Sequence, residues 1–486
     1  MKILFVSSEM SPLAATGGLG DVVNSLPRAL REKGHDARVV LPLYRQIKQD
    51  YFEDLTFMRW AMIRLGWRTM YSGLFYLELD GLPVYLIDNE FYFGHDNLYI
   101  DYTFDIERFA FFQCAVLETL GEEMEFEPDI LHLNDWQSGM IPVLLEAHYK
   151  SKGYHENVQS VMTIHNLKYQ GIHGREQVQD LFDLPEVYMS EAGILKDGVP
   201  NFLKSGIQFS NRVTTVSPNY AKEIMTDYYG EGLNGLLAAQ GWKVSGILNG
   251  IDTESYNPET DPEIKANYSA QAWKRGKAAC KKALQEELGL AQQAKTPLFV
   301  MVSRLVEQKG IDLLLHIIDE LLAEDVQLVI LGTGNQEYER KLAEAAKRHP
   351  ENMRALIKFD SKLARRLYSA GDIYLMPSIF EPCGLSQMIA MRYGTLPVVR
   401  QTGGLADTVQ AYDKFKYTGT GFGFLNINAH ELLFTAKEAI GVYKNNPDAW
   451  NNMVRAAMYS EFSWDQPADE YIKLYQDIKK ETSRID

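Results

Sequence analysis

Cysteine, basic residues and long apolar runs are all scarce in this sequence, and each shortage excludes a class of protein. Three cysteines, at positions 114, 280 and 383, are too few and too scattered for a disulfide framework, so we expect a reducing compartment, the cytoplasm or a plastid stroma. Lys and Arg total 49 against 65 Asp and Glu, and the resulting net charge of −16 argues against nucleic acid or an anionic membrane as the main partner. No segment is long enough to span a bilayer, and residues 2–6 are expected to form a buried strand and not a signal peptide. No Cys/His spacing is typical of a metal site, so we expect neither a metal nor a cofactor.

The chain of 486 residues is too long for one compact core, so two domains are expected. Short β-branched runs alternate with amphipathic stretches in both halves, which indicates βαβ units and two doubly wound parallel sheets. An Asn-Gly pair at 249–250 places the hinge near residues 246–252, and Ser463 is expected to begin a last helix. The expected strands are residues 2–6, 37–41, 84–87, 130–133, 158–164 and 213–216, then 298–302, 327–331, 373–376 and 396–399.

Two glycine turns echo each other, Thr-Gly-Gly-Leu-Gly-Asp at 16–21 and Thr-Gly-Gly-Leu-Ala-Asp at 402–407. Both lead into segments that read as helices. A glycine pair that opens a helix lets an anion approach bare backbone N–H groups, where the helix dipole favours negative charge. One such turn is most often an ordinary loop. Two of them, one in each half, suggest a phosphate-bearing ligand held between two domains.

Two loops of the second half carry candidate chemistry directly after predicted strands. Arg304 and Lys309 lie five residues apart and can grip both phosphates of a diphosphate, or they can be solvated surface charges. Glu381 lies on a strand-to-helix loop, at the rim where α/β sheets bind ligands. A carboxylate that merely stabilises the start of a helix explains Glu381 equally well.

Polar residues also follow two predicted strands of the first half. Asp135 and Trp136 can bind a sugar hydroxyl and stack on its ring, although Trp136 can equally belong to the core. His165 follows the next strand, and its neighbours Asn166 and Tyr169 favour a polar pocket over the more common structural role of a lone histidine.

Taken together, these residues resemble the family of bacterial glycogen synthases and plant starch synthases, which are retaining glycosyltransferases. The resemblance covers nearly the whole chain and includes a sequence highly specific to the group, Phe-Glu-Pro-Cys-Gly-Leu at 380–385. The other motifs, in order, are Gly-Gly-Leu-Gly-Asp-Val (17–22), Asn-Asp-Trp (134–136), Thr-Ile-His-Asn-Leu (163–167), Thr-Val-Ser-Pro (215–218), Asn-Gly-Ile-Asp (249–252), Ser-Arg-Leu with Gln-Lys-Gly (303–310), Arg-Tyr-Gly-Thr-Leu-Pro (392–397) with Thr-Gly-Gly-Leu (402–405), and Phe-Ser-Trp (462–464).

The resemblance implies an α/β fold of the GT-B type, with two facing Rossmann-like domains and a cleft between them. The implied domains are residues 1–246 on the acceptor side, residues 247–462 for the nucleotide sugar, and a helix at 463–486 that crosses back to the first domain. The implied reaction moves glucose from ADP-glucose to the non-reducing end of an α-1,4-glucan, glycogen or starch, with retention of configuration. The family has no generally accepted protein nucleophile, and a front-face reaction assisted by the leaving phosphate is commonly invoked.

The resemblance also implies roles for single residues. Arg304 and Lys309 would hold the leaving diphosphate, Glu381 would hold glucosyl hydroxyls, and His165 and Asp135 would lie on the sugar side. The implied substrate-binding positions are Gly17, Gly18, Cys383, Gly384, Leu385, Thr402 and Gly403.

Two positions depart from the family pattern. The family usually has lysine two places before the glycine pair, where this chain has Ala15, and many members have histidine where this chain has Gln137. Loss of one charge-assisted hydrogen bond costs about 1.5–3 kcal/mol, which weakens an enzyme without abolishing it.

Two alternatives to the synthase follow from these departures and from the wider fold. Ala15 is compatible with a catalytically impaired homologue, a regulatory protein that binds glucan or nucleotide. A transferase that uses UDP-glucose is the other alternative, but such relatives generally carry a second glutamate eight residues after the first, where this chain has Ile389.

Overall fold

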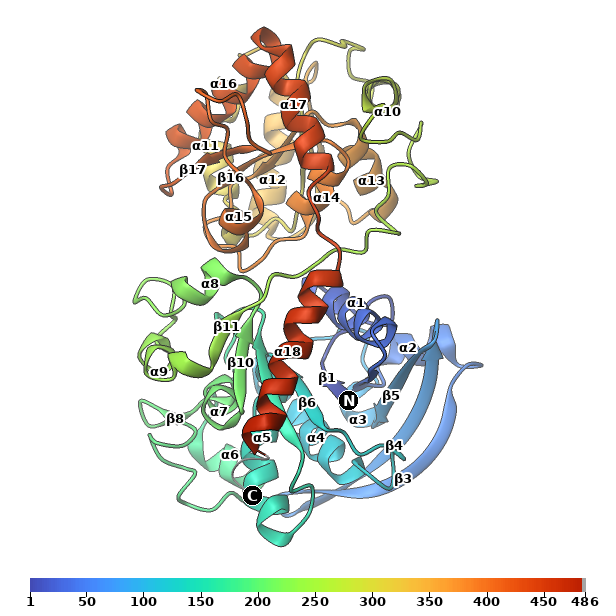
Figure 1. The fold of residues 1–486 in the computed structure, drawn as a ribbon, viewed down its shortest axis with the longest axis vertical. Helices are drawn as coiled ribbons and strands as arrows, with labels where there is room; N and C mark the ends of the chain where they lie inside the picture. The colour runs from blue at the N-terminus through green and yellow to red at the C-terminus, as the bar shows by residue number, and fades with distance from the viewer. Residues whose placement is uncertain (483–486) are drawn as a thin grey trace. The chain divides into compact units, whose positions relative to one another are not determined.

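The computed structural model describes residues 1–482 and divides into two compact α/β units (Figure 1). The N-terminal unit consists of Met1–Ile247 together with the chain from Trp464 onward, and the C-terminal unit consists of Leu248–Ser463. Within residues 1–482, every helix is too short or too polar to cross a bilayer.

The N-terminal unit is built on a nine-stranded sheet in the order β11-β10-β7-β6-β1-β2-β5-β4-β3. All neighbouring pairs are parallel except β3 with β4 and β4 with β5. The strands are β1 (Lys2–Val6), β2 (Asp36–Pro42), β3 (Thr56–Leu65), β4 (Arg68–Leu79), β5 (Leu82–Asp88), β6 (Ile130–Asn134), β7 (Gln159–Ile164), β10 (Arg212–Thr215) and β11 (Val244–Gly246), with a separate pair β8 (Leu195–Lys196) and β9 (Val199–Pro200).

Helices connect these strands, and the sheet's central strands are buried on both faces. The strand β1 shows the pattern, because Ile3, Leu4, Phe5 and Val6 are all fully buried. The helices of this unit are α1 (Gly18–Glu32), α2 (Arg45–Tyr51), α3 (Glu90–Phe93), α4 (Tyr102–Thr119), α5 (Ile141–Leu144), α6 (Arg175–Phe182), α7 (Phe202–Phe209), α8 (Pro218–Glu223), α9 (Asn234–Ala239) and α18 (Asp465–Thr482).

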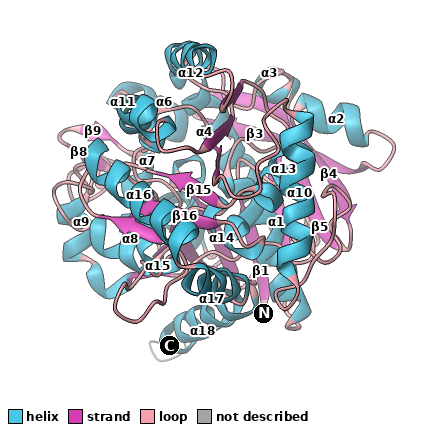
Figure 2. Ribbon diagram, turned by 90° about the horizontal axis from the view of Figure 1, so that it is seen from above, coloured by secondary structure: helices cyan, strands magenta, loops and turns pink. Residues whose placement is uncertain are grey.

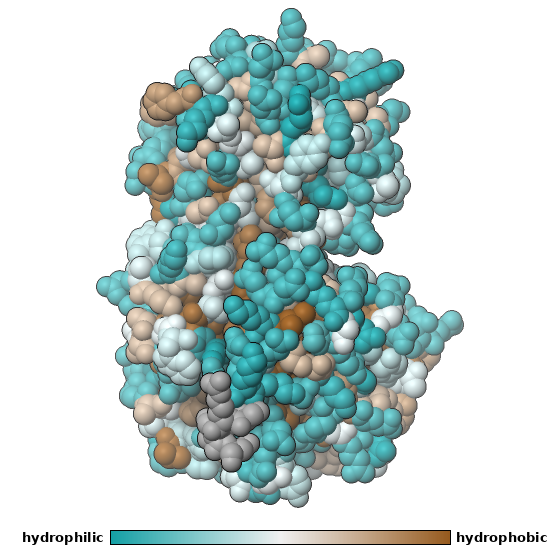
Figure 3. Space-filling view, viewed as in Figure 1, coloured by the Kyte–Doolittle hydropathy of each residue, from teal (hydrophilic) through white to brown (hydrophobic). Residues whose placement is uncertain are grey.

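The last helix, α18, packs on the N-terminal unit although the C-terminal unit precedes it in the sequence. The Tyr475 hydroxyl lies 2.6 Å from Nδ1 of His132 on β6, and both side chains are buried. Salt bridges from Lys33 to Asp465 and from Lys479 to Asp129, each 2.6 Å long, fix the helix near its two ends. Its other face carries exposed polar residues, in keeping with the largely hydrophilic surface that Figure 3 shows in this region.

The C-terminal unit has a six-stranded, fully parallel sheet in the order β14-β13-β12-β15-β16-β17. Figure 2 shows β15 and β16 between α11 and α16 on one side and α10 and α13 on the other. The strands are β12 (Leu298–Val302), β13 (Gln327–Leu331), β14 (Met353–Leu356), β15 (Ile373–Met376), β16 (Leu396–Arg400) and β17 (Phe422–Phe424), and the helices are α10 (Trp273–Glu287), α11 (Ile311–Leu322), α12 (Gln336–Arg348), α13 (Ser361–Ala370), α14 (Ser386–Arg392), α15 (Gly403–Thr408), α16 (Ala429–Asn445) and α17 (Pro447–Met458).

The α/β class and the ten strands predicted from sequence are confirmed, with shifts of a residue or two at their ends. The expectation that both sheets are wholly parallel is wrong for the N-terminal unit. There the hairpin β3–β4, which follows β2 in the sequence, extends the sheet beyond β5 as its antiparallel edge. A two-residue turn at Gly66 and Trp67 joins its strands, and such a short connection allows only antiparallel pairing.

Candidate functional site

Each of the two sheets has one position at which its strand order reverses, and the candidate residues of that unit follow the strands near this position. In the C-terminal unit β12 and β15 are neighbours, and the connections from their carboxyl ends run in opposite directions, to β13 and to β16. In the N-terminal unit β1 lies between β2 and β6. Ligands of open α/β sheets bind beyond the carboxyl ends of strands at such a point.

A largely buried salt bridge in the C-terminal unit joins two of the predicted residues. The Lys309 ammonium lies 2.6 Å from Oε2 of Glu381, and the two side chains are 15% and 8% exposed. The hydroxyl of Ser378 donates to the same oxygen over 3.0 Å. A cation and a hydroxyl therefore orient Glu381, and it is not a free carboxylate at a helix start.

Glycines let three loops approach one another around this pair. Gly310 has φ +68°, and a Cβ there would lie 2.0 Å from the carbonyl oxygen of Pro377. Gly403 has φ +45°, and its Cβ would lie 2.0 Å from the carbonyl oxygen of Glu381. A side chain at either position would push the loops after β12, β15 and β16 apart, because the clash is with backbone.

Two side chains that the sequence analysis did not single out brace the loop after β15. The Arg400 guanidinium is buried at the end of β16 and donates to the carbonyl oxygens of Ser378 (3.1 Å) and Ile379. Gln308 donates from its amide to the carbonyl of Phe380 over 3.2 Å and accepts from the Ile379 N–H at its own carbonyl. The signal in the sequence was the position of Arg400, an arginine directly after the apolar run 396–399.

The backbone between Glu381 and α14 presents the remaining predicted contacts. Cys383 is buried, and burial raises the pKa of its thiol to about 12, so the thiol is no nucleophile at neutral pH. Gly384 has φ +75°, and Leu385 is the residue from which α14 begins. The N–H groups at a helix start point away from the helix toward an incoming acceptor.

Arg304 and Thr402 differ in their surroundings. Arg304 is exposed on the loop after β12, and among residues 1–482 its guanidinium has no hydrogen bond or ion pair to another side chain. Thr402 is fully buried and stands directly before α15. The structure thus brings Lys309 into contact with Glu381 and leaves Arg304 exposed on the loop that also carries Lys309.

In the N-terminal unit, Asp135 and His165 are joined through backbone. Oδ1 of Asp135 accepts the His165 N–H over 2.8 Å, and Nε2 of His165 lies 2.9 Å from Oδ1 of Asn134. Burial raises the pKa of the Asp135 carboxyl to about 7 and lowers the pKa of His165 to about 3. At neutral pH His165 is therefore uncharged, and Asp135 titrates in the working range.

Asp135 also has an unusual backbone, with φ +54° and ψ −173°. Such a conformation in a residue other than glycine costs about 1–3 kcal/mol and is concentrated at functional sites. The turn directs the Asp135 carboxylate toward the end of β7. Trp136, in contrast, is buried and packs edge-on to Phe109 with 5.5 Å between ring centroids, so it belongs to the core and does not offer a sugar-stacking face.

The glycine turn of the N-terminal unit opens α1 as predicted, with Gly17 at its N-cap and Gly18 as its first residue. No side chain caps this helix start. Glu9, at the end of β1, fixes the turn by accepting the Thr16 N–H (2.6 Å) and the Thr16 hydroxyl (2.9 Å). Ala15 is exposed beside these bonds, where a longer side chain has room.

Glu9 links the glycine turn, through Tyr99, to Gln137, the second position that departs from the family pattern. Tyr99 donates its hydroxyl to Oε1 of Glu9 over 2.6 Å, and the amide of Gln137 lies 3.5 Å from the same hydroxyl. Oε1 of Gln137 is buried, and within the described part of the chain it accepts no hydrogen bond. Glu9 and Tyr99 escaped the sequence analysis because 90 residues separate them and neither belongs to a motif.

Within residues 1–482, no three His, Cys, Asp or Glu side chains converge as metal ligands would. The C-terminal unit instead offers the Lys309–Glu381 ion pair and the backbone N–H groups at the start of α14, which can hold hydroxyl groups and a polyanion without a metal. The N-terminal unit, by itself, offers the Asp135 carboxyl and the neutral imidazole of His165.

Family models cover most of the chain. Residues 2–239 match the model "Starch synthase catalytic domain", and residues 286–433 match "Glycosyl transferases group 1". The glycogen synthases of Exiguobacterium sibiricum and of Desulforamulus reducens are each 45% identical to this chain, over 98% of this chain and 99% of each relative.

Solved structures show the same likeness in three dimensions. The catalytic domain of starch synthase IV from Arabidopsis thaliana, bound to ADP and acarbose, superposes with a TM-score of 0.92, 34% identity and 99% of both chains covered. Sucrose-phosphate synthase from Thermosynechococcus elongatus reaches a TM-score of 0.62 at 17% identity, over 98% of both chains, and shares the fold alone.

Proposed function

We propose a function for this chain from one premise: it belongs to the family of glycogen synthases and starch synthases, and it is a glycosyltransferase. It transfers glucose from ADP-glucose to the non-reducing end of an α-1,4-glucan and retains the anomeric configuration. Support for the donor and the acceptor comes from the Arabidopsis starch synthase, which is bound to ADP and to the oligosaccharide acarbose.

The single observation that carries this proposal is the Lys309–Glu381 contact on loops that glycine residues draw together. The lysine provides a fixed positive charge, and exposed Arg304 provides a second one on the same loop. Together they neutralise the diphosphate as the bond to glucose breaks, which lowers the barrier by electrostatic stabilisation of the leaving group. Arginine contributes a planar fork of donors and lysine a compact charge.

Glu381 holds hydroxyl groups of the glucosyl unit in this proposal. Its carboxylate accepts from Lys309 and Ser378 through Oε2, which leaves Oε1 for a sugar hydroxyl. The N–H groups of Cys383, Gly384 and Leu385 add donors at the start of α14. Thr402 and Gly403 line the same loops and hold the donor from the start of α15.

In the N-terminal unit, Asp135 and His165 act on the sugar side, and Gly17 with Gly18 receives donor phosphate. His165 stays neutral, so its carbonyl and ring present partial negative charge without adding a cation. This suits a glucosyl group that becomes positive as the leaving group departs. Expulsion of the phosphate and attack by the acceptor then occur on one face, without a protein nucleophile, and the configuration is retained.

We also propose that the protein works in a reducing compartment, in the cytoplasm of a bacterium. Its three cysteines are free thiols, and Cys280 and Cys383 are buried. None of them contributes to stability through a disulfide.

The test is a donor assay with glycogen as primer and radiolabelled ADP-glucose or UDP-glucose. We expect label in glycogen from ADP-glucose, and we expect Arg304→Ala and Lys309→Ala to lose at least about a hundredfold in kcat/KM. Lys362→Ala, which removes an exposed lysine of the same unit, is the matched control and keeps parental activity. Parental turnover by both site variants would refute the leaving-group role, and preference for UDP-glucose would refute the donor.

A further inference from the structure

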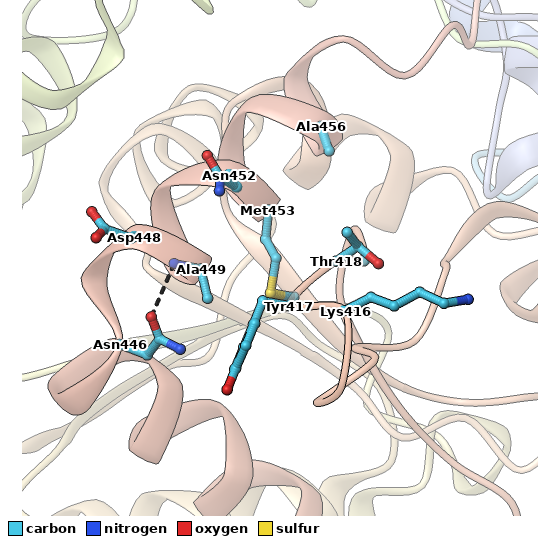
Figure 4. A pocket seen from close by; sticks show the side chains of 10 residues that line it. Lys416, Tyr417, Thr418, Asn446, Asp448, Ala449, Asn452, Met453 and Ala456 are labelled. Carbon is cyan, nitrogen blue, oxygen red and sulfur yellow. Dashed lines mark hydrogen bonds between the residues drawn. The ribbon is translucent and has the colours of Figure 1, made fainter.

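A cavity of about 520 Å³ opens on the C-terminal unit away from the residues discussed so far (Figure 4). It lies between the loop 410–421 and the first turns of α17, and Tyr417, Asn446, Asp448, Asn452 and Met453 are among its lining residues. Ligand pockets typically have volumes of about 300–1,000 Å³. The cavity is therefore large enough for a small ligand or a segment of a chain.

The cavity lies at the amino ends of the parallel strands, whereas the candidate active site lies at their carboxyl ends. The loop 410–421 leads directly into β17, which begins at Phe422, so the loop stands at the amino ends of the parallel strands. Lys309 and Glu381 follow strands β12 and β15 and stand at the carboxyl ends. A ligand in this cavity would not be a substrate in position to react.

Tyr417 is held in the cavity by a rigid turn. Its N–H donates to the carbonyl of Asp413 over 2.7 Å, and the Asp413 N–H donates to the carbonyl of Thr418 over 2.8 Å. The Asp413 carboxylate also accepts the N–H groups of Phe415 and Lys416. The backbone that carries the aromatic side chain is thereby fixed.

The turn holds Tyr417 in an unfavourable backbone conformation. Its φ is +57°, which is uncommon for a residue with a bulky side chain, and its side chain is still 53% exposed. Glycine or asparagine would occupy this position with less strain. Backbone strain of this kind is concentrated at functional sites.

Hydrogen-bonding groups surround the ring. Asn446 and Met453 line the cavity together with Tyr417, and in Figure 4 both side chains extend toward it. Oδ1 of Asn446 caps α17 through the Ala449 N–H (3.1 Å), and no bond within residues 1–482 occupies its amide nitrogen. The Asp448 carboxylate and the Asn452 amide are exposed on the same helix and are likewise without a side-chain partner in the described chain.

The charges at the cavity favour a neutral ligand. Lys416 and Asp448 contribute one charge of each sign to its lining, so neither a polyanion nor a polycation gains from the local field. An aromatic face, amide groups and a carboxylate match a pyranose, which offers a C–H face for packing and hydroxyl groups at its rim.

We propose that this cavity is a second glucan-binding site, in which Tyr417 packs against a glucosyl ring of an α-1,4-glucan and Asn446 and Asn452 bind its hydroxyl groups. The identity of the ligand rests on the proposed function, because the acceptor is the neutral polysaccharide that the enzyme meets. A second contact with the same polymer raises the effective concentration of chain ends at the active site.

The test replaces Tyr417 with asparagine, which removes the ring and suits the left-handed backbone. Retardation of the protein in native gels that contain glycogen measures affinity. We expect Y417N to be no less stable than the parent in urea, and to lose affinity for glycogen by about tenfold. Tyr417→Phe keeps the ring and should keep most of the affinity. Tyr154→Ala, which removes a tyrosine of similar exposure from the N-terminal unit, is the control and should leave retardation unchanged.

Transfer of glucose to maltotriose and to glycogen, measured in parallel, separates this inference from the proposed function. We expect Y417N to raise KM for glycogen and to leave kcat and KM for maltotriose at parental values. Retardation of Y417N equal to that of the parent would overturn the second site, whatever the transfer assay shows. If the parent protein transfers no glucose but its retardation by glycogen still depends on Tyr417, the second site is upheld and the proposed function is refuted.

Discussion

The ammonium of Lys309 and the carboxylate of Glu381 form a 2.6 Å salt bridge although 72 residues separate them in the sequence. The pair is largely buried, so each charge depends on the other for the solvation that water no longer supplies. A ligand that approaches the lysine finds it already positioned.

Removal of one member of this pair is predicted to destabilise the C-terminal unit. Glu381→Gln and Lys309→Met each leave a buried charge without its partner, and we expect each to lower the free energy of unfolding by about 3 kcal/mol. The double variant should lose less than the sum of the two, because no buried charge remains. Urea unfolding of the four proteins gives the coupling, and strictly additive losses would contradict it.

Ala15 is predicted to limit activity. Ala15→Lys should raise kcat/KM with ADP-glucose by roughly ten- to a hundredfold, because a charge-assisted hydrogen bond is worth about 1.5–3 kcal/mol. The side chain has room, since Ala15 is exposed. Ala15→Met adds similar length without charge and serves as the control. Equal gains in both variants would show that packing and not charge is responsible.

Asp135 is predicted to make stability depend on pH. Its pKa is about 7 in the folded protein against 3.8 for the ordinary group, so the folded state binds its proton more tightly than the unfolded state. This contribution is fully present below about pH 4, decreases as pH rises toward 7, and is lost above it. A shift of this size corresponds to an upper bound of about 4 kcal/mol.

Asp135→Asn removes the titration and keeps an acceptor for the His165 N–H. The stability of the variant relative to the parent should therefore increase between pH 5 and pH 8, as urea unfolding at each pH can measure. An Asn variant whose relative stability stays constant over that interval would place the folded-state pKa of Asp135 below it. The limb of the pH–rate profile near pH 7 should disappear in the same variant.

Gly403 is predicted to tolerate no side chain. Gly403→Ala combines a left-handed backbone with a clash against the carbonyl of Glu381, so we expect a loss of about 2 kcal/mol or more and a matching loss of activity. Gly441→Ala is the matched control: it lies in α16, a Cβ there meets nothing within 4 Å, and it should stabilise by about 0.5–1 kcal/mol. Urea unfolding and the donor assay compare the two.

Local patterns predicted most of the fold. Alternation of β-branched runs with amphipathic stretches revealed ten strands, and the glycine pairs at 17–18 and 403–404 do open helices. The hairpin β3–β4 was missed because its outward face carries large apolar side chains. Trp60 and Met62 are 61% and 52% exposed, so the sequence lacks the alternation of polar and apolar residues that marks a half-buried strand.

Contacts between loops were beyond the reach of local patterns. Lys309 and Glu381 were both singled out, but their contact depends on β12 and β15 being neighbours, which the sequence order does not state. Glu9 and Tyr99 also meet across 90 residues of sequence, and neither lies in a recognisable motif. Trp136 was ambiguous between ring stacking and core, and only its surroundings, Phe109 and Phe202, decide for the core.

The return of α18 to the N-terminal unit has a consequence for synthesis. The segment that leaves the ribosome first lacks the hydrogen bond to Nδ1 of His132 until Tyr475 has been translated. The C-terminal unit, whose residues are contiguous from Leu248 to Ser463, has its whole sequence available earlier. The C-terminal unit, which is synthesised second, can therefore complete its fold before the N-terminal unit does. A truncation that removes α18 would damage the N-terminal unit and leave the sequence of the C-terminal unit intact.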